Sequence, residues 1–322
     1  MKAVLARAAG GPEVLSSIEQ PVPQPRDGEV RVRALSIGVN YADVLCRQAV
    51  HQSMRPPPII PGCEAAGIVE ACGAGVSRHR VGDRVGVYSP FGGAYAEALV
   101  VPENYALSLP EGMSFEEGAA FTHVYLSAHE ALNASAPPRP GASVLVTAAA
   151  GGLGGAVLQL AAALELRVIA AVGSPTKRQM LLDRGIETVI DYGTSHLTEA
   201  VLEVTDGRGV DVAIEALGTQ PTFEAALRVL RPGGTLSSLG VYSTDLTIPL
   251  GAFAAGLGDH RIVTTLCPGG KERMRRLINV IQSGRVDLTA MVTHRYKLDD
   301  IEKAYDLFAH QRDGVLKVAI TP

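Results

Sequence analysis

The chain has 322 residues, of which 47% are hydrophobic and 19% charged, and its net charge is −4 at pH 7. Such a length suits two domains that each bury a core, and such a composition is that of a folded chain. The weak negative charge gives no general attraction to nucleic acid or to an anionic membrane. Neither an apolar run that could span a bilayer nor a secretory signal is present, so we expect a cytoplasmic protein with no nucleic-acid or membrane partner.

Residues 1–110 contain short apolar runs that are separated by turns rich in Gly and Pro. This pattern predicts a β-rich, barrel-like domain. Its strands are expected within EVRVRALSIGV (29–39), AAGIVEACG (65–73), DRVGVYS (83–89) and YAEALVV (95–101). A helix is expected in MSFEEGAAF (113–121), where Ser114 and Glu117 have the spacing of a capping box.

From Gly141 onward, predicted strands alternate with predicted helices. Apolar runs of four to eight residues are typical of strands buried on both faces, so we expect a parallel, doubly wound α/β sheet. The expected strands are 144–147, 167–173, 187–191, 210–218, 234–241 and 261–266, and the expected helices are 153–164, 176–185, 196–204 and 221–230.

The C-terminal tail contains two further helices, at 271–285 and 299–310, and a closing strand at 316–321. The doubly wound sheet is complete without that strand, so we expect it to return to the first domain. The predicted domains are therefore 1–122 with 269–322, and 123–268.

A glycine-rich turn, VTAAAGGLGG (146–155), follows the first strand of the second domain and opens a helix. Its small residues allow a pyrophosphate to approach the backbone N–H groups and the positive helix end. We expect a dinucleotide to bind at this turn, which contributes Ala149, Gly151, Gly152, Leu153 and Gly154.

The next strand ends without the acidic residue that usually grips the ribose 2′-hydroxyl of NAD. Gly173 and Ser174 stand there, followed by Lys177 and Arg178. A carboxylate would repel a 2′-phosphate, whereas a hydroxyl and a cation would hold one. The sequence therefore predicts NADPH rather than NADH.

The four cysteines, Cys46, Cys63, Cys72 and Cys267, include no C-x-x-C pair. Their spacing favours neither a disulfide framework nor a four-thiolate zinc site. Cys63 can be read as a small buried thiol or as a metal ligand, and we favour the buried thiol.

Several stretches resemble the medium-chain dehydrogenase/reductases, and most closely their zinc-independent quinone oxidoreductase (zeta-crystallin-like) branch. They are MKAVLARAAGGPEVL, GVNYADVLCR, IIPGCEAAGIVEACGAGV, VGDRVG and VTAAAGGLGG. The resemblance implies a GroES-like catalytic domain, a Rossmann domain, NADPH as cofactor and a homodimer. It also implies hydride transfer to a quinone.

The resemblance also bears on zinc. By motif, the three ligand positions of the zinc-dependent alcohol dehydrogenases fall at Asn40, Cys63 and near His123. A neutral amide is a poor zinc ligand, so we expect no metal, although Asp43, Glu64 and Cys46 can in principle complete a set. The tail 263–308 resembles the alcohol dehydrogenase branch as closely as the quinone branch.

The resemblance implies roles for individual residues. Asn40 would bond the ribose or the acceptor oxygen, and Asp43 would orient its neighbours or act as a structural cap. His51, which replaces a tyrosine of related enzymes, is a candidate proton donor or a solvated bystander. The remaining cofactor contacts are expected at Ser127 and Tyr192, and at Leu217, Leu239 and Val241, which should line the nicotinamide.

Three alternatives to a quinone reductase stay open. They are an enoyl or enone reductase with the same hydride geometry, a zinc-dependent alcohol dehydrogenase, and a non-catalytic NADPH- or RNA-binding module. The basic run KERMRR (271–276) is the one feature that favours RNA, and a solvated helix face explains it equally well.

Overall fold

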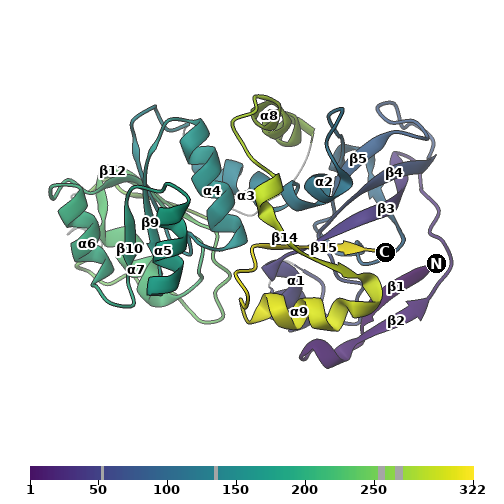
Figure 1. The fold of residues 1–322 in the computed structure, drawn as a ribbon, viewed down its shortest axis with the longest axis horizontal. Helices are drawn as coiled ribbons and strands as arrows, with labels where there is room; N and C mark the ends of the chain where they lie inside the picture. Colours follow the sequence, from purple (N-terminus) through teal and green to yellow (C-terminus); the bar gives the residue numbers. More distant parts are fainter. Residues whose placement is uncertain (52–53, 134–136, 253–257, 265–270) are drawn as a thin grey trace. The chain divides into compact units, whose positions relative to one another are not determined.

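The computed structural model describes residues 1–51, 54–133, 137–252, 258–264 and 271–322. The chain divides into two compact units (Figure 1). Unit 1 comprises Met1–Leu126 with Pro268–Pro322, and unit 2 comprises Ser127–Cys267. The helix α3 (Val124–Leu132) contains the boundary.

Unit 1 is built around a mostly antiparallel, seven-stranded sheet with β3 (Glu29–Val39) at its centre. Buried and more exposed side chains alternate along the first half of β3, as expected for a strand with one face on a core. The neighbouring strands are β4 (Glu64–Cys72), β5 (Arg84–Tyr88), β6 (Ala98–Pro102) and β7 (Ala106–Ser108). A separate hairpin joins β1 (Lys2–Ala6) and β2 (Leu15–Glu19).

The end of the chain returns to this sheet, which confirms the prediction for the closing strand. β15 (Lys317–Thr321) pairs with β3 at Ile37–Val39, and β14 (Val292–Lys297) pairs with β15 (Figure 1). Unit 1 also contains the helices α1 (Tyr41–Arg47), α2 (Phe115–Phe121), α8 (Lys271–Gln282) and α9 (Ile301–Ala309). Ser114 caps α2 in the predicted capping box with Glu117.

Unit 2 contains the predicted doubly wound sheet. Its six parallel strands have the order β10-β9-β8-β11-β12-β13, so the chain order reverses between β8 and β11. The strands are β8 (Ser143–Val146), β9 (Arg167–Val172), β10 (Val189–Asp191), β11 (Val210–Glu215), β12 (Leu230–Ser238) and β13 (Arg261–Thr264). In such sheets, ligands bind at the carboxyl ends of the strands next to this reversal.

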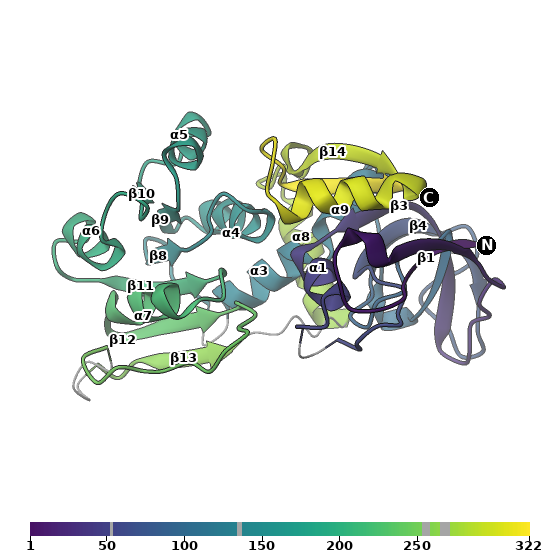
Figure 2. The ribbon, with the colours of Figure 1, turned by 90° about the horizontal axis from the view of Figure 1, so that it is seen from below.

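In the described part of unit 2, four helices cover the sheet, and Figure 2 shows α4 and α6 on opposite sides of it. They are α4 (Gly152–Ala163), α5 (Pro175–Asp183), α6 (Leu197–Val204) and α7 (Gln220–Arg228). Each coincides with a predicted helix to within two residues. Buried Leu145, Ile169, Val201, Phe223 and Leu236 belong to the core between helices and sheet.

The structure differs from the sequence prediction in a few elements. The helix α1 and the strand β14 were not predicted, because both are short and lack a clear apolar period. β11 ends at Glu215 rather than at Gly218, because the Glu215 carboxylate folds back onto the N–H groups of Leu217 and Gly218. Residues 265 and 266 of the predicted last strand lie outside the described residues.

Candidate active site

The glycine-rich turn of unit 2 has the shape that a pyrophosphate requires. A Cβ added at Gly154 would lie 2.3 Å from Ala148 O and 2.6 Å from Ala149 Cα, so only glycine fits there. Gly151 is the N-cap of α4 and provides no capping side chain, which leaves the N–H groups of the first helical turn for an anion. The residues at this turn therefore fit a dinucleotide.

The region expected to hold the 2′-phosphate lies at the ends of β9 and β10. The Tyr192 ring covers Gly173, where an added Cβ would meet the ring at 3.1 Å. Ser174 is the N-cap of α5, and its Oγ accepts the Lys177 N–H at 3.4 Å. Lys177 is exposed and makes no ion pair with any residue that the structure describes. The structure thus brings a hydroxyl, a free cation and an aromatic ring to one corner of the sheet.

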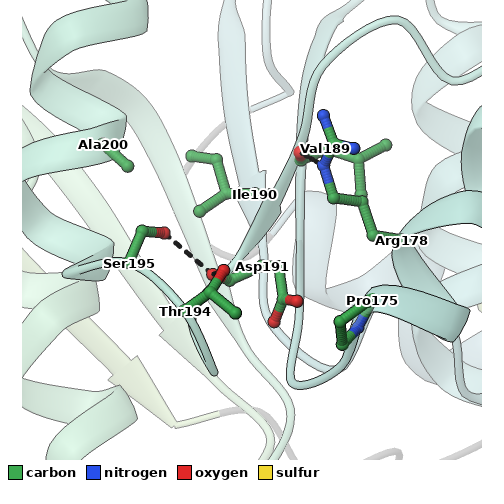
Figure 3. Close-up of a pocket in the computed structure, with 8 residues that line it drawn as sticks. All are labelled: Pro175, Arg178, Val189, Ile190, Asp191, Thr194, Ser195 and Ala200. Atoms are coloured by element: carbon green, nitrogen blue, oxygen red, sulfur yellow. Dashed lines mark hydrogen bonds between the residues drawn. The ribbon is translucent and has the colours of Figure 1, made fainter.

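A shallow pocket of about 410 Å³ lies next to this corner (Figure 3). It is lined by Pro175, Arg178, Val189, Ile190, Asp191, Thr194, Ser195 and Ala200. Arg178 Nε donates to Val189 O at 3.2 Å, and Ser195 Oγ donates to Asp191 O at 2.8 Å. Arg178 is exposed, as Lys177 is, but this hydrogen bond holds its guanidinium at the pocket wall.

The residues expected to line the nicotinamide lie in loops just after β11 and β12. Leu217 is 44% exposed, whereas Leu239 and Val241 are half-buried. The two loops touch, because a Cβ added at Gly218 would lie 2.6 Å from Val241 O. Ser127 is buried in α3 at the start of unit 2. These residues stay predicted contacts.

Unit 1 contains a buried polar cluster around Asn40, the residue that precedes α1. Asp43 Oδ2 accepts the Asn40 N–H at 2.9 Å and the Tyr95 hydroxyl at 2.8 Å. Asn40 and Asp43 are at most 2% exposed. This geometry shows that Asp43 caps the start of α1, and its role in orienting neighbouring groups stays a prediction.

Lys317 belongs to the same cluster and was missed by the sequence analysis. Its Nζ donates to Asn40 Oδ1 at 2.6 Å and pairs with Glu64 Oε1, while Asn40 Nδ2 donates to the same Glu64 oxygen at 2.8 Å. The other Glu64 oxygen accepts from Thr122 Oγ1 at 2.8 Å and from His123 N at 2.7 Å. Lys317 and Glu64 are buried, and together they fix the orientation of the Asn40 amide.

The pKa of Glu64 is set by its burial and by its contact with Lys317. Burial raises the pKa of Glu64, but the Lys317 ammonium and the hydrogen bonds from Lys317 and Asn40 outweigh it, so the net pKa lies below its usual value. Glu64 is therefore ionised at neutral pH. In the sequence, the one indication of the Lys317–Glu64 pair is a lysine within an otherwise apolar closing strand.

Cys63 is a buried free thiol, as the favoured reading of the sequence predicts. Burial and the neighbouring Asp43 raise its pKa well above the usual value, so it remains protonated and unreactive. Burial likewise raises the pKa of Cys46 to about 11. Cys267 lies outside the described residues.

Two histidines belong to unit 1 near this cluster. Burial lowers the pKa of His123 to about 4, and its ring stacks on Tyr88 at 5.7 Å. Burial also lowers the pKa of His51. Both rings are neutral at pH 7, so His51 can give a proton only from a neutral ring N–H. Its role as proton donor stays a prediction.

The donors in this cluster do not fit a catalytic zinc ion. Asn40 Oδ1 and one Glu64 oxygen already bind the Lys317 ammonium, which would repel a second cation, and the Cys63 thiol is protonated. Within the described parts of the chain, no group of three or more His, Cys, Asp or Glu residues has the arrangement of a metal site. Of the expected ligands, the Asn40 oxygen is thus occupied by Lys317, and the Cys63 thiol would have to lose its proton before it could bind a metal.

Asp43 predicts a pH dependence of stability. Burial raises its pKa to about 6, against hydrogen bonds that lower it. Because the folded-state pKa exceeds the unfolded value of 3.8, its stabilising contribution is full below pH 3.8 and is lost as the pH rises through 6. We expect the wild type to lose up to about 3 kcal/mol of unfolding free energy over this range relative to Asp43→Asn. Denaturant titrations at pH 4 and pH 7.5 measure the difference. An equal change in unfolding free energy for the two proteins between these pH values would contradict the assignment.

Comparison with known proteins places these features in a family. Residues 26–111 match the alcohol dehydrogenase GroES-like domain, and residues 152–283 match the zinc-binding dehydrogenase domain. An alcohol dehydrogenase from Cupriavidus necator is 41% identical over 94% of both chains. A quinone oxidoreductase from Salmonella typhimurium is 34% identical over 92% of this chain and 93% of its own.

Solved structures agree with this placement. A quinone oxidoreductase from Pseudomonas syringae superimposes with a TM-score of 0.89 at 30% identity, covering 100% of this chain and 99% of its own. A quinone oxidoreductase from Escherichia coli, complexed with NADPH, has a TM-score of 0.87 at 29% identity and covers 100% of both chains. The described residues include no helix long and apolar enough to cross a membrane. From its two domains and its relatives along nearly its whole length, the chain belongs to the medium-chain dehydrogenase/reductase superfamily and is an oxidoreductase.

Proposed function

We propose that this protein is an NADPH-dependent, zinc-independent reductase that acts on quinones. The observation that carries the proposal is the corner at Ser174, Lys177 and Tyr192, where a hydroxyl and a free cation stand in place of an acid. The solved relative with NADPH and the quinone oxidoreductases along the full chain support it. Per turnover, one quinone, one NADPH and one proton give one hydroquinone and one NADP⁺.

In this proposal, unit 2 holds the cofactor. Bound NADPH supplies a hydride from its nicotinamide ring. The N–H groups around Gly151–Gly154 hold the pyrophosphate, and Lys177 with Ser174 holds the 2′-phosphate. The loops with Leu217, Leu239 and Val241 exclude water from the ring, and Ser127 is an additional contact.

In this proposal, unit 1 provides the groups that bind the acceptor and supply its proton. Lys317 and Glu64 occupy one side of the Asn40 amide, so its remaining N–H has a fixed direction for an acceptor or ribose oxygen. The ammonium on Oδ1 also polarises the amide and strengthens that N–H as a donor. The proton that follows the hydride comes from solvent through His51, whose neutral ring takes up a proton at one nitrogen as it gives one from the other. This arrangement needs no metal to polarise the acceptor, because quinones are already electrophilic.

Two other acceptors are each favoured by one observation. A 2-haloacrylate reductase has a TM-score of 0.86 at 27% identity, which favours an activated C=C bond. The Cupriavidus necator relative favours an alcohol. The alignment with that relative runs over 356 positions, more than the 322 residues of this chain, so the relative has inserted residues that this chain lacks.

A panel of acceptors separates these functions. We expect simple quinones to be reduced with NADPH at a kcat/KM at least about tenfold above that with NADH, and above that for any enone. Alcohols with NADP⁺ are expected to give no turnover above background. A higher kcat/KM for a 2-haloacrylate or an enone would move the function to C=C reduction, and absence of turnover with every acceptor would favour a binding module.

We also propose a cytoplasmic homodimer. β13 lies at the edge of the unit 2 sheet, and Ile262 on it is 38% exposed. Exposed apolar edges are usually paired or covered, and a second copy of β13 would pair this one. Light scattering at micromolar concentration is expected to give twice the mass of one chain, and a monomeric mass would contradict this.

A further inference from the structure

A buried carboxylate stands at the centre of the ligand-binding edge of unit 2. Glu215 is the last residue of β11, the strand next to the reversal of strand order, and it is 0% exposed. Among the described residues of unit 2, it and Asp191 are the buried acids. A fully buried carboxylate is costly unless it is compensated, so its presence at this edge requires an explanation.

Among the described residues, the Glu215 carboxylate accepts hydrogen bonds from neutral donors alone. Oε1 accepts from Leu217 N at 2.9 Å, Gly218 N at 3.0 Å and Thr222 Oγ1 at 2.8 Å. Oε2 accepts from Tyr242 OH at 2.5 Å. No described cation forms an ion pair with it. Both oxygens act as acceptors, so neutral donors solvate the carboxylate without a counter-charge beside it.

The same residue joins the ends of three central strands. Its backbone oxygen accepts the Leu239 N–H at 2.8 Å, just after β12. The next residue, Ala216, donates its N–H to Thr147 Oγ1 at 3.0 Å, just after β8. A Cβ added at Gly240 would lie 2.4 Å from both Glu215 Oε2 and Gly218 Cα, so the two loops close directly over the carboxylate. The charge therefore lies immediately beneath the loops that contain Leu217 and Leu239.

The direction of a bound dinucleotide follows from the two ends of the sheet. Lys177 and Ser174 mark the 2′-phosphate end beside β9 and β10, and the pyrophosphate belongs at the start of α4. The other half of the cofactor, with the nicotinamide, then extends over β11 and β12. Glu215 lies on that side of the reversal.

Resting on the proposed use of NADPH, we propose that the buried charge of Glu215 makes the site prefer the oxidised nicotinamide. The oxidised ring carries a positive charge, whereas the reduced ring is neutral. A fixed anion in a water-poor site attracts only the charged form. The protein thereby favours loss of the hydride by the cofactor, which is the step that every reductase must promote. This effect does not depend on which acceptor takes the hydride.

The test is the ratio of two dissociation constants, Kd for NADPH divided by Kd for NADP⁺. Fluorescence titration gives the first, and calorimetry gives the second. Glu215→Gln is expected to lower the ratio by roughly fivefold or more, because it removes the charge and keeps the size. Thr222→Val removes one neutral donor and leaves the charge less solvated, so it is expected to raise the ratio roughly twofold. A purely structural role would weaken both forms equally and leave the ratio unchanged.

Asp191→Asn is the matched control. It removes the other buried acid of this sheet at β10, on the 2′-phosphate side, so the ratio is expected to stay within about twofold of the wild type. If Glu215→Gln does not fold, the other two variants test the inference: the ratio of dissociation constants should rise in Thr222→Val and stay unchanged in Asp191→Asn. An unchanged or lower ratio in Thr222→Val, or an unchanged ratio in folded Glu215→Gln, would overturn the inference. Failure of the wild type to bind either form would instead overturn the proposed function.

Discussion

Lys317→Met is expected to destabilise the protein by about 3–5 kcal/mol at pH 7.5, because it leaves the Glu64 carboxylate buried without a cation. The side chains of the pair are 1% and 0% exposed, so water cannot replace the lost partner without local opening. Denaturant unfolding measures the loss. Lys297→Met is the matched control, since Lys297 is exposed on β14 in the same sheet, and it should change stability by less than about 0.5 kcal/mol.

The pH dependence separates charge from packing in this variant. In the wild type, the pKa of Glu64 is lowered, so its contribution is present above the usual value of 4.5 and is lost as the pH falls further. Without Lys317, burial dominates and raises that pKa, so the stability deficit should shrink as the pH falls towards 5. The double variant Lys317→Met with Glu64→Gln should recover part of the loss at pH 7.5. A deficit of equal size at both pH values would show that packing and not the ion pair is responsible.

Lys177→Ala is expected to weaken NADPH binding by roughly ten- to a hundredfold and to leave NADH binding nearly unchanged. One charge-assisted contact is worth about 1.5–3 kcal/mol, and only NADPH carries the 2′-phosphate that would receive it. Fluorescence titration with both cofactors measures the effect. Arg184→Ala, at the other end of α5, is the matched control and should change neither affinity. Equal weakening of both cofactors by Lys177→Ala would remove the basis for the 2′-phosphate site.

The doubly wound sheet could be predicted because its signals are local. β8 and β9 are short apolar runs, Ser174 and Thr219 cap α5 and α7, and the glycine-rich turn before Gly154 marks the start of α4. The strand β3 matches its predicted range, 29–39, because alternation along it records one buried face. By contrast, α1 has only seven residues, and its start depends on contacts with Tyr95 rather than on a period of its own.

The cluster around Lys317 could not be predicted, because its members are distant in the sequence. Lys317 contacts Asn40 across 277 residues and Glu64 across 253. A lysine in an apolar strand indicates that a partner exists but not which one. Glu215 was one acid within the predicted strand 210–218 until the structure showed that β11 ends there and that two loops fold over it. For Lys317, the register of a sheet decides which charges meet, and for Glu215, the fold of two loops decides what covers the charge.

The most direct test of zinc-independent, NADPH-dependent quinone reduction is metal content per chain, measured together with turnover before and after chelator treatment. The donor set around Lys317 predicts a substoichiometric zinc content and an unchanged rate of NADPH-dependent quinone reduction after chelation. About one zinc per chain, with activity lost on its removal and restored on its return, would contradict the account and move the function towards alcohol oxidation.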